Sequence, residues 1–392
     1  MKPVVSFHWK KAQRYLAAAR GRELPWQTVD LALLAPVLTL CVFGMLAVFW
    51  AGLSPQFSSP LALLRAKVAS VLFGAIVGIS FSRIDYHCYE DRRFQLAVSL
   101  AAIAFLVLLF FVGLEESGAN LRFLVFNRTI QPTEYIKIIV VLVLSYTIAE
   151  TYGKDLPDYF IGSIHSLLLS ILLVLIALQP DYGVVLILLA TSLSMLIVAR
   201  VRARRSIFFV TLFVALGGLT FLIVCFVLAK DFYVLDRFRI FLECFLVVDC
   251  KEFQLSNGYK VIASGKLFGN HIVNAIHPHG VLPMECNDFI FCVIAEEMGF
   301  VGVALLLLVY LWFIQRGFFV AKYCRDFFGQ LIAFGLTWII GFQALLNILV
   351  ATGLFPITGI TLPFVSHGGN SLISAMIAVG ILMNISRNTF KT

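Results

Sequence analysis

Apolar runs long enough to cross a bilayer as helices recur along almost the whole chain, separated by shorter polar segments. The runs are continuous, and this excludes a membrane β-barrel, whose strands alternate polar with apolar residues. The pattern predicts an all-α polytopic membrane protein with ten transmembrane helices. These are expected near residues 29–50, 66–81, 96–114, 136–151, 160–178, 183–199, 207–228, 288–314, 329–351 and 372–385.

Composition supports this class of fold. Hydrophobic residues make up 60% of the 392 residues and charged residues 13%, so a soluble globule is excluded. Residues 1–27 form a polar, basic N-terminal segment with no cleavable signal peptide, because the apolar run that follows is long enough to stay as an anchor. One membrane domain, residues 28–392, is expected after it.

The net charge of +8 is best explained by membrane orientation and does not point to a nucleic-acid partner. If the N-terminus is cytoplasmic, most of the 30 lysines and arginines fall in cytoplasmic segments. An even number of spans then places the C-terminus in the cytoplasm as well. The long polar loop between the seventh and eighth spans, about residues 229–287, is expected on the outer side.

In this topology four polar clusters lie at the heads of spans on the outer side. Chance would place one or two there, so four of them predict a single site at the outer membrane face. The clusters are residues 131–137, 179–183, 287–288 and 363–371.

The segment 282–299 begins as a polar loop and ends in an apolar run, with Asp288 at the boundary. Helical spacing places Asp288, Cys292, Glu296 and Gly299 on one face, with Glu296 about 12 Å further along the same helix. Acids are costly to bury in so apolar a chain, which favours a function for Asp288. The alternative is structural: Asp288 only caps the helix, and Glu296 only pairs with a buried cation.

Several cations lie near membrane depth on the predicted outer side. An arginine gives bidentate contacts to an anionic headgroup such as pyrophosphate, and a lysine provides a point charge. The alternative is snorkelling of long side chains to lipid headgroups. The candidates are Arg122, Arg128, Lys137, Lys260 and Lys266.

Other polar residues have structural alternatives of their own. Glu134 and Lys137, three residues apart, would form a local ion pair on a first helical turn. Asp181 follows a proline and would cap the next helix. Gln343 and Asn347, at positions i and i+4, form a polar stripe that is expected to cross-link helices.

Metal, covalent and disulfide chemistry are less favoured. Adjacency of Ser366 and His367 does not by itself give nucleophile–base geometry. The outer-loop histidines lack an i,i+4 pair and nearby thiolates, which disfavours a zinc site. One disulfide between two cysteines of the outer loop is an alternative that the sequence leaves open. The residues concerned are His271, His277, His279, Cys244, Cys250 and Cys286.

Four motifs in order, QPTEYIKI, QPDYG, NDFIFCVIAEEMGFVG and GLFPITGITLPFVSHGGNSL, resemble the shape, elongation, division and sporulation (SEDS) family. The resemblance covers about residues 28–388 and is stronger to the RodA branch than to the FtsW branch. It implies a peptidoglycan glycosyltransferase that polymerises lipid II at the outer face of the bacterial inner membrane for cell-wall elongation. A class B penicillin-binding protein is the implied partner, alongside membrane lipids.

The resemblance also assigns residues. The acid held essential for polymerisation in the family falls on Asp288. The segment departs from the family pattern at Met284, Cys286 and Asn287, and the last cluster departs at Asn370. Expected substrate-binding residues are Arg122, Glu134, Lys137, Asp181, Lys260, Ser366 and His367.

The implied reaction is attack of the acceptor sugar's 4-hydroxyl on C1 of the donor sugar. Asp288 would accept the hydroxyl proton as general base. Arg122, Lys137 or a divalent cation (magnesium or manganese) would stabilise the leaving pyrophosphate. Two alternatives stay open: a flippase for the lipid-linked precursor, and an FtsW-like division polymerase or scaffold.

Overall fold

The computed structural model describes residues 30–54, 57, 59–116, 119–125, 128–151, 164–179, 181–199, 253–270 and 287–389. In these ranges, seven helices are long and apolar enough to cross a membrane, and two shorter apolar helices accompany them. The protein is therefore a polytopic helical membrane protein, as the sequence predicts. The expected span at 207–228 and most of the outer loop at 229–287 lie outside the described residues, so ten spans stay a prediction.

Most helices match the predicted spans within a few residues at each end. The second begins six residues early, because Pro60 opens it at a position where a missing N–H is no loss. The helices are α2 (Leu31–Ala51), α3 (Pro60–Arg83), the 3-10 helix η1 (Tyr86–Glu90), α4 (Arg92–Val112), α5 (Pro132–Thr151), α7 (Ile164–Leu178), α8 (Tyr182–Val198), α11 (Phe253–Ser264), α12 (Ile290–Tyr323), α13 (Phe327–Ala351) and α14 (Gly369–Thr389).

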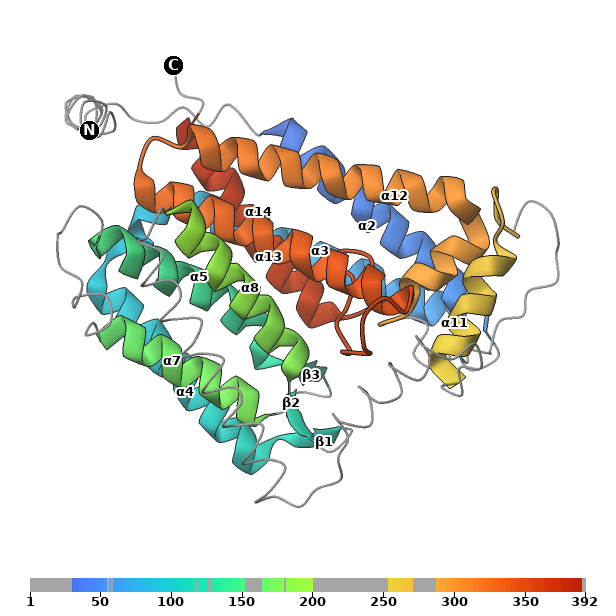
Figure 1. Cartoon of the computed structure of the whole chain (residues 1–392), viewed down its shortest axis with the longest axis horizontal. Coiled ribbons are helices and arrows are strands. Elements are labelled where there is room, and N and C mark those ends of the chain that lie inside the picture. Colours follow the sequence, from blue (N-terminus) through green and yellow to red (C-terminus); the bar gives the residue numbers. More distant parts are fainter. Residues whose placement is uncertain are drawn as a thin grey trace.

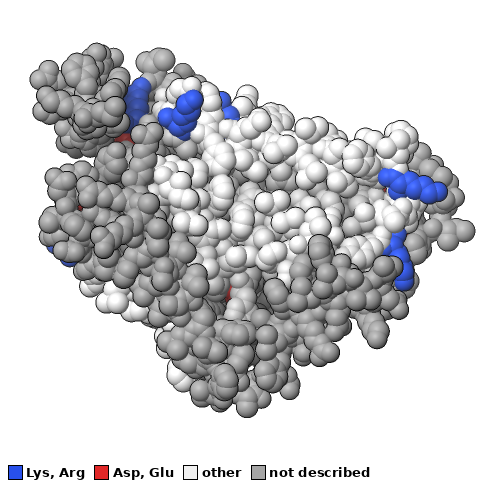
Figure 2. Space-filling model, in the orientation of Figure 1, with Lys and Arg blue, Asp and Glu red and all other residues white. Residues whose placement is uncertain are grey.

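The helices pack side by side into one bundle (Figure 1). Helix α14 packs along α3, and α12 packs against both α2 and α13, while α4 and α7 pair at the lower left of the view. Helix α13 also contacts α5, α8 and α14, so it lies at the centre of the bundle. On the face shown in Figure 2, lysines and arginines lie at two opposite ends of a broad and nearly uncharged surface, as expected where lipid surrounds a protein.

The start of α2 and the end of α14 meet at one end of this bundle. Asp30 accepts hydrogen bonds from Arg316 of α12, at 3.0 Å to Oδ2, and from Ser386 of α14, at 2.6 Å. Because the described N- and C-terminal ends are adjacent, they lie on the same side of the bundle.

The segment before α5 was expected to be a loop, but it contains a small antiparallel sheet. Strands β1 (Leu114–Glu116), β2 (Ala119–Val125) and β3 (Arg128–Ile130) pair in that order, with Leu114 opposite Arg122 and Phe123 opposite Ile130. The sheet lies in the connection between α4 and α5, so the apolar spans are helical as predicted and the strands are an addition to them. Strands β1 and β3 have three residues each and are too short to show a periodic apolar pattern, and the seven residues of β2, ANLRFLV, do not alternate strictly between polar and apolar.

Helix α12 corrects the predicted straight span at 288–314. It begins at Ile290, bends at Gly299 (φ 64°, ψ −163°) and continues to Tyr323. At about 1.5 Å per residue, the part after Gly299 is about 36 Å long and crosses a bilayer alone. The segment 290–298 is a separate half-helix, visible at the right of Figure 1. The predicted face is therefore broken, because Asp288 precedes the helix and Gly299 is the bend.

The bend at Gly299 is required by the turn after α11. A Cβ on Gly299 would lie 2.4 Å from the nitrogen of Gly269, so no larger residue fits. The N–H of Phe300 donates to the carbonyl of Lys266 at 3.0 Å, and the N–H of Asn270 donates to the carbonyl of Glu296 at 2.8 Å. These contacts fix the half-helix against α11 and set where Asp288 lies.

Candidate active site

Asp288 lies in a turn just before α12 that two other segments hold in place. The Asn347 amide of α13 donates to the carbonyl oxygen of Asp288 at 2.8 Å and to that of Ile360 at 2.7 Å. The Ser366 hydroxyl donates to the carbonyl oxygen of the preceding residue, Asn287, at 2.6 Å. All three hydrogen bonds are accepted by backbone carbonyl oxygens, and they clamp the turn without involving the Asp288 carboxylate.

The carboxylate of Asp288 faces the backbone of Gly359. A Cβ on Gly359 would lie 3.8 Å from Asp288 Oδ2. The N-cap residue of α12 is Phe289, whose side chain makes no capping hydrogen bond. Asp288 therefore lies one residue before the N-cap position of α12.

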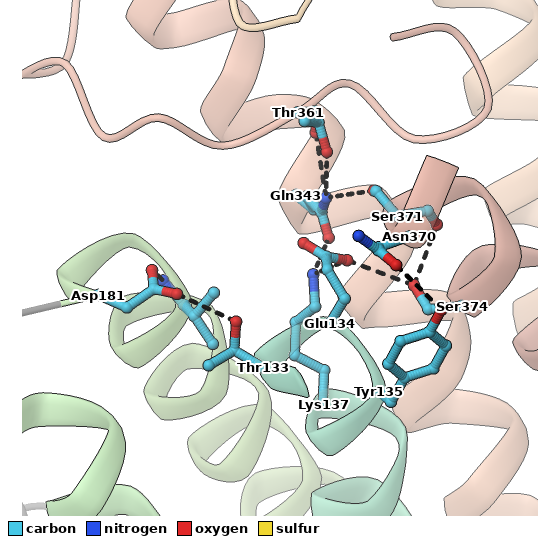
Figure 3. A network of polar contacts seen from close by, with 11 residues as sticks. Thr133, Glu134, Tyr135, Lys137, Asp181, Gln343, Thr361, Asn370, Ser371 and Ser374 are labelled. Atoms are coloured by element: carbon cyan, nitrogen blue, oxygen red, sulfur yellow. Dashed lines mark hydrogen bonds and ion pairs between the residues drawn. The ribbon is translucent and has the colours of Figure 1, made fainter. Parts of the chain in front are cut away.

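Glu134 and Lys137 form the buried ion pair that their spacing predicts. Lys137 Nζ lies 2.8 Å from Glu134 Oε2, and the two side chains are 3% and 8% exposed, respectively. Lys137 also donates to Gln343 Oε1 at 2.6 Å, and the Ser374 hydroxyl of α14 donates to Glu134 Oε2 at 3.3 Å (Figure 3). The pair thus links α5 to α13 and α14.

Gln343 joins this pair to the segment that follows α13. Its Nε2 donates to the carbonyl oxygen of Thr361 at 3.0 Å and lies 3.3 Å from the Ser371 hydroxyl (Figure 3). Asn347 lies one turn further along α13, about 6 Å along the axis. The predicted cross-linking by this stripe is confirmed. One face of α13 therefore holds both the Glu134–Lys137 pair and the Asp288 turn.

Asp181 caps α8, as its sequence context predicts. Its carboxylate accepts from the N–H of Val184 at 3.3 Å and from the hydroxyl of Thr133 at 3.1 Å. Burial raises the pKa of the Asp181 carboxyl, and these two hydrogen bonds oppose the rise. Since Thr133 immediately precedes Glu134, the contact brings the head of α8 to the first turn of α5.

Ser366 has a positioning role in this structure. Its buried hydroxyl oxygen accepts the N–H of Leu362 at 2.8 Å while its hydrogen is donated to Asn287. The adjacent His367 is half-buried, and desolvation, with a smaller contribution from the Lys67 cation, lowers the pKa of its imidazole. At neutral pH this favours an uncharged His367.

The structure gives no side-chain contacts for the predicted cation Arg122 and places a second one, Lys260, on the surface. Arg122 lies on β2, and its side chain is outside the described residues. Lys260 is exposed on α11 and does not belong to the network in Figure 3. Within the described ranges, no group of three or more His, Cys, Asp or Glu residues is arranged to hold a metal ion. The outer-loop histidines and cysteines considered for zinc or a disulfide lie outside those ranges.

The sequence prediction missed Lys67. This residue is 0% exposed and donates to the carbonyl oxygens of Phe364, at 2.8 Å, and Ser366, at 2.6 Å. A lone lysine at the edge of the span expected from residue 66 was the available signal. Because α3 begins at Pro60, Lys67 lies two turns inside the helix.

Together these contacts make a site suited to acid–base chemistry. The Asp288 carboxylate stands on a clamped turn, and the face of α13 that holds this turn also holds a buried carboxylate–ammonium pair through Gln343. Such an arrangement can accept a proton from a hydroxyl nucleophile without reorganising the surrounding backbone.

The chain is similar to known bacterial proteins along nearly its whole length. A family model described as "cell cycle protein", covering FtsW, RodA and SpoVE, matches residues 31–391. The chain is 30% identical to a probable peptidoglycan glycosyltransferase FtsW of Bacillus subtilis, over 92% of this chain and 91% of that protein. It is 29% identical to stage V sporulation protein E of the same organism, over 91% of this chain and 97% of that protein.

Solved structures agree in fold. A structure titled as a peptidoglycan synthase complex that coordinates polymerization and crosslinking matches with a TM-score of 0.72 and 25% identity, over 94% of this chain and 100% of the matched chain. The rod shape determining protein RodA of Thermus thermophilus matches with a TM-score of 0.67 and 24% identity, over 94% and 99%. The relatives carry names from more than one branch, so the RodA branch stays a prediction.

Proposed function

Because this chain belongs to the FtsW, RodA and SpoVE family, the SEDS family, we propose that it polymerises lipid II into glycan strands at the outer face of the bacterial inner membrane. The observation that carries the proposal is the clamped turn at Asp288, held by Asn347 and Ser366. The naming of relatives as peptidoglycan glycosyltransferases supports the reaction class.

In the proposed reaction, the 4-hydroxyl of the acceptor sugar attacks C1 of the donor sugar. A new C1–O bond forms, the C1–O bond to pyrophosphate breaks, and the hydroxyl proton moves to the Asp288 carboxylate. A sugar hydroxyl is a weak nucleophile, so a fixed carboxylate within hydrogen-bond reach supplies the needed base. The clamping hydrogen bonds are accepted by backbone oxygens, so they fix the turn without involving the carboxylate.

Lys137 receives a narrower role than the sequence suggests. Its ammonium is buried and balanced by Glu134, so it acts mainly by holding Gln343 and the Thr361 segment in place. We assign recognition of the anionic pyrophosphate to Arg122 on β2. Within the described residues, no group of three or more His, Cys, Asp or Glu side chains is arranged to hold the predicted divalent cation.

The proposed setting is a multi-pass protein of the inner membrane with both termini in the cytoplasm. We propose a class B penicillin-binding protein as partner, and cell-wall elongation as the process. Similarity to a peptidoglycan synthase complex supports the partner. The FtsW-like division polymerase is the alternative, supported by the names of the curated relatives.

The direct test is to incubate the purified protein with lipid II, with and without a class B penicillin-binding protein, and to separate the products by size. Glycan strands in either reaction are the expected result. A protein that is folded in both reactions and yields no polymer in either would contradict the proposal. Movement of lipid II across vesicles without polymer would instead support the flippase.

A further inference from the structure

Lys67 is a fully buried cation inside a membrane helix, and its hydrogen-bond acceptors are backbone carbonyls. Its Nζ lies 2.8 Å from the carbonyl oxygen of Phe364 and 2.6 Å from that of Ser366. Charged side chains are expensive at membrane depth and tend to mark functional regions. Both acceptors belong to the turn that also contacts Asn287.

The turn at residues 362–366 has a backbone that needs support. Phe364 has φ +66°, in the left-handed region that a bulky residue rarely adopts, and its ring is buried. Such a conformation persists only where the surroundings determine it. Lys67 donates to the carbonyl of Phe364 itself, so its ammonium acts directly on the strained residue.

Neighbouring helices complete the support of this turn. The Tyr310 hydroxyl of α12 donates to the carbonyl of Pro363. On α2, a Cβ at Gly44 would lie 2.7 Å from the carbonyl oxygens of Phe364 and Val365, so the turn is pressed against that helix. Among these described contacts only Lys67 brings a full charge, and a charge-assisted hydrogen bond is about twice as strong as a neutral one.

We propose that Lys67 is a positioning residue for Asp288. It holds the 362–366 turn in its left-handed conformation, and Ser366 of that turn fixes Asn287 beside Asp288. Three hydrogen bonds make this connection from α3 to the start of α12: Lys67 to Phe364, Lys67 to Ser366, and Ser366 to Asn287. The catalytic part of the inference rests on the proposed function, whereas the conformational part does not.

The test uses Lys67→Met, which keeps side-chain length but removes the charge and all donors. A matched control is Asn384→Leu, because Asn384 is also buried and also makes two hydrogen bonds to backbone groups, from Tyr86 N–H and to the Ser82 carbonyl. Asn384 lies on α14 near the opposite end of the bundle. Lys67→Gln keeps two donors and provides a measurable variant if Lys67→Met does not fold.

The first readout is amide hydrogen exchange of the full-length protein in detergent. Lys67→Met is expected to speed exchange in residues 360–368 and 287–290 at least tenfold, Lys67→Gln by less, and Asn384→Leu not at all there. The second readout is polymerisation of lipid II, in which Lys67→Met should lower kcat by about ten- to a hundredfold with KM within about twofold.

Unchanged exchange in both segments for Lys67→Met and Lys67→Gln would overturn the inference. So would an equal effect of Asn384→Leu on the same segments, or a normal kcat in an active wild-type background. If wild type makes no polymer, the proposed function fails while the exchange experiment still decides whether Lys67 holds the turn.

Discussion

The hydroxyl of Ser366 lies 2.6 Å from the carbonyl oxygen of Asn287, across 79 residues of sequence. The Ser366 hydroxyl oxygen also accepts a hydrogen bond from the N–H of Leu362 at 2.8 Å. One buried hydroxyl thereby closes its own turn and holds the turn that carries Asp288. The position of the candidate base thus depends on a segment remote in sequence.

Replacing Ser366 by alanine should therefore reduce polymerisation strongly. Ser366→Ala leaves a buried N–H and a buried carbonyl without this partner, at a cost of about 1–3 kcal/mol. Because the lost hydrogen bonds stabilise the conformation that positions Asp288, glycan synthesis per folded protein should drop by about ten- to a hundredfold. Ser170→Ala is the control, because the Ser170 hydroxyl donates to the carbonyl oxygen of Ser166 within its own helix. Equal rates for the two variants would contradict the positioning role of Ser366.

The buried Glu134–Lys137 pair predicts strongly coupled substitutions. Removing one partner leaves an uncompensated buried charge and should destabilise the protein by about 3–5 kcal/mol. The double variant Glu134→Gln/Lys137→Met removes both charges and should lose less than the sum of the two single variants. Thermal unfolding of all four proteins in one detergent measures the coupling. Additive losses would mean that the two side chains do not depend on each other.

The bend in α12 predicts that Gly299 tolerates no side chain. In Gly299→Ala the Cβ would meet the backbone of Gly269, and the positive φ adds about 1–2 kcal/mol of strain. A loss of several kcal/mol in total is expected. Gly341→Ala is the matched control, since its Cβ would meet only side-chain atoms of Ile314, Cδ1 at 2.9 Å and Cγ1 at 3.1 Å, which can move. A Gly299→Ala protein as stable as Gly341→Ala would rule out the bend.

The proposed orientation predicts opposite labelling of two exposed sites. Lys266 lies in the turn after α11, and Arg325 lies between α12 and α13 at the other end of the long part of α12. In a cysteine-free background, Lys266→Cys should react with an impermeant thiol reagent in intact spheroplasts, and Arg325→Cys should react only after lysis. The reverse pattern would invert the topology and place the site on the cytoplasmic side.

Much of the fold was predictable because apolar runs report membrane helices directly. The four polar clusters were also predicted to meet. Contacts from Thr133 to Asp181 and from Ser366 to Asn287 join them in two pairs, and the Tyr135 hydroxyl links the pairs by donating to Asn370 Oδ1 at 3.3 Å. The bend at Gly299 was not predictable, because the apolar pattern continues through it and the cause lies in the turn after α11. Lys67 was missed for a similar reason. Its acceptors are carbonyls about 300 residues away, and backbone carbonyls leave no mark in a sequence.

Asp288→Asn tests the central claim most directly. The clamping contacts use the backbone oxygens of Asn287 and Asp288, so the substitution leaves them in place while removing the base. A general base typically contributes about 10²–10⁴-fold to a rate. The matched control is Asp326→Asn, since Asp326 caps α13 at its opposite end and asparagine caps about as well as aspartate.

The measurement is the rate of glycan formation from lipid II by the two purified, folded variants and the wild type. Asp326→Asn should polymerise near the wild-type rate, while Asp288→Asn should retain its fold and its thermal stability yet form no detectable glycan. Polymer formation by Asp288→Asn at near the wild-type rate would contradict the assignment of Asp288 as the base.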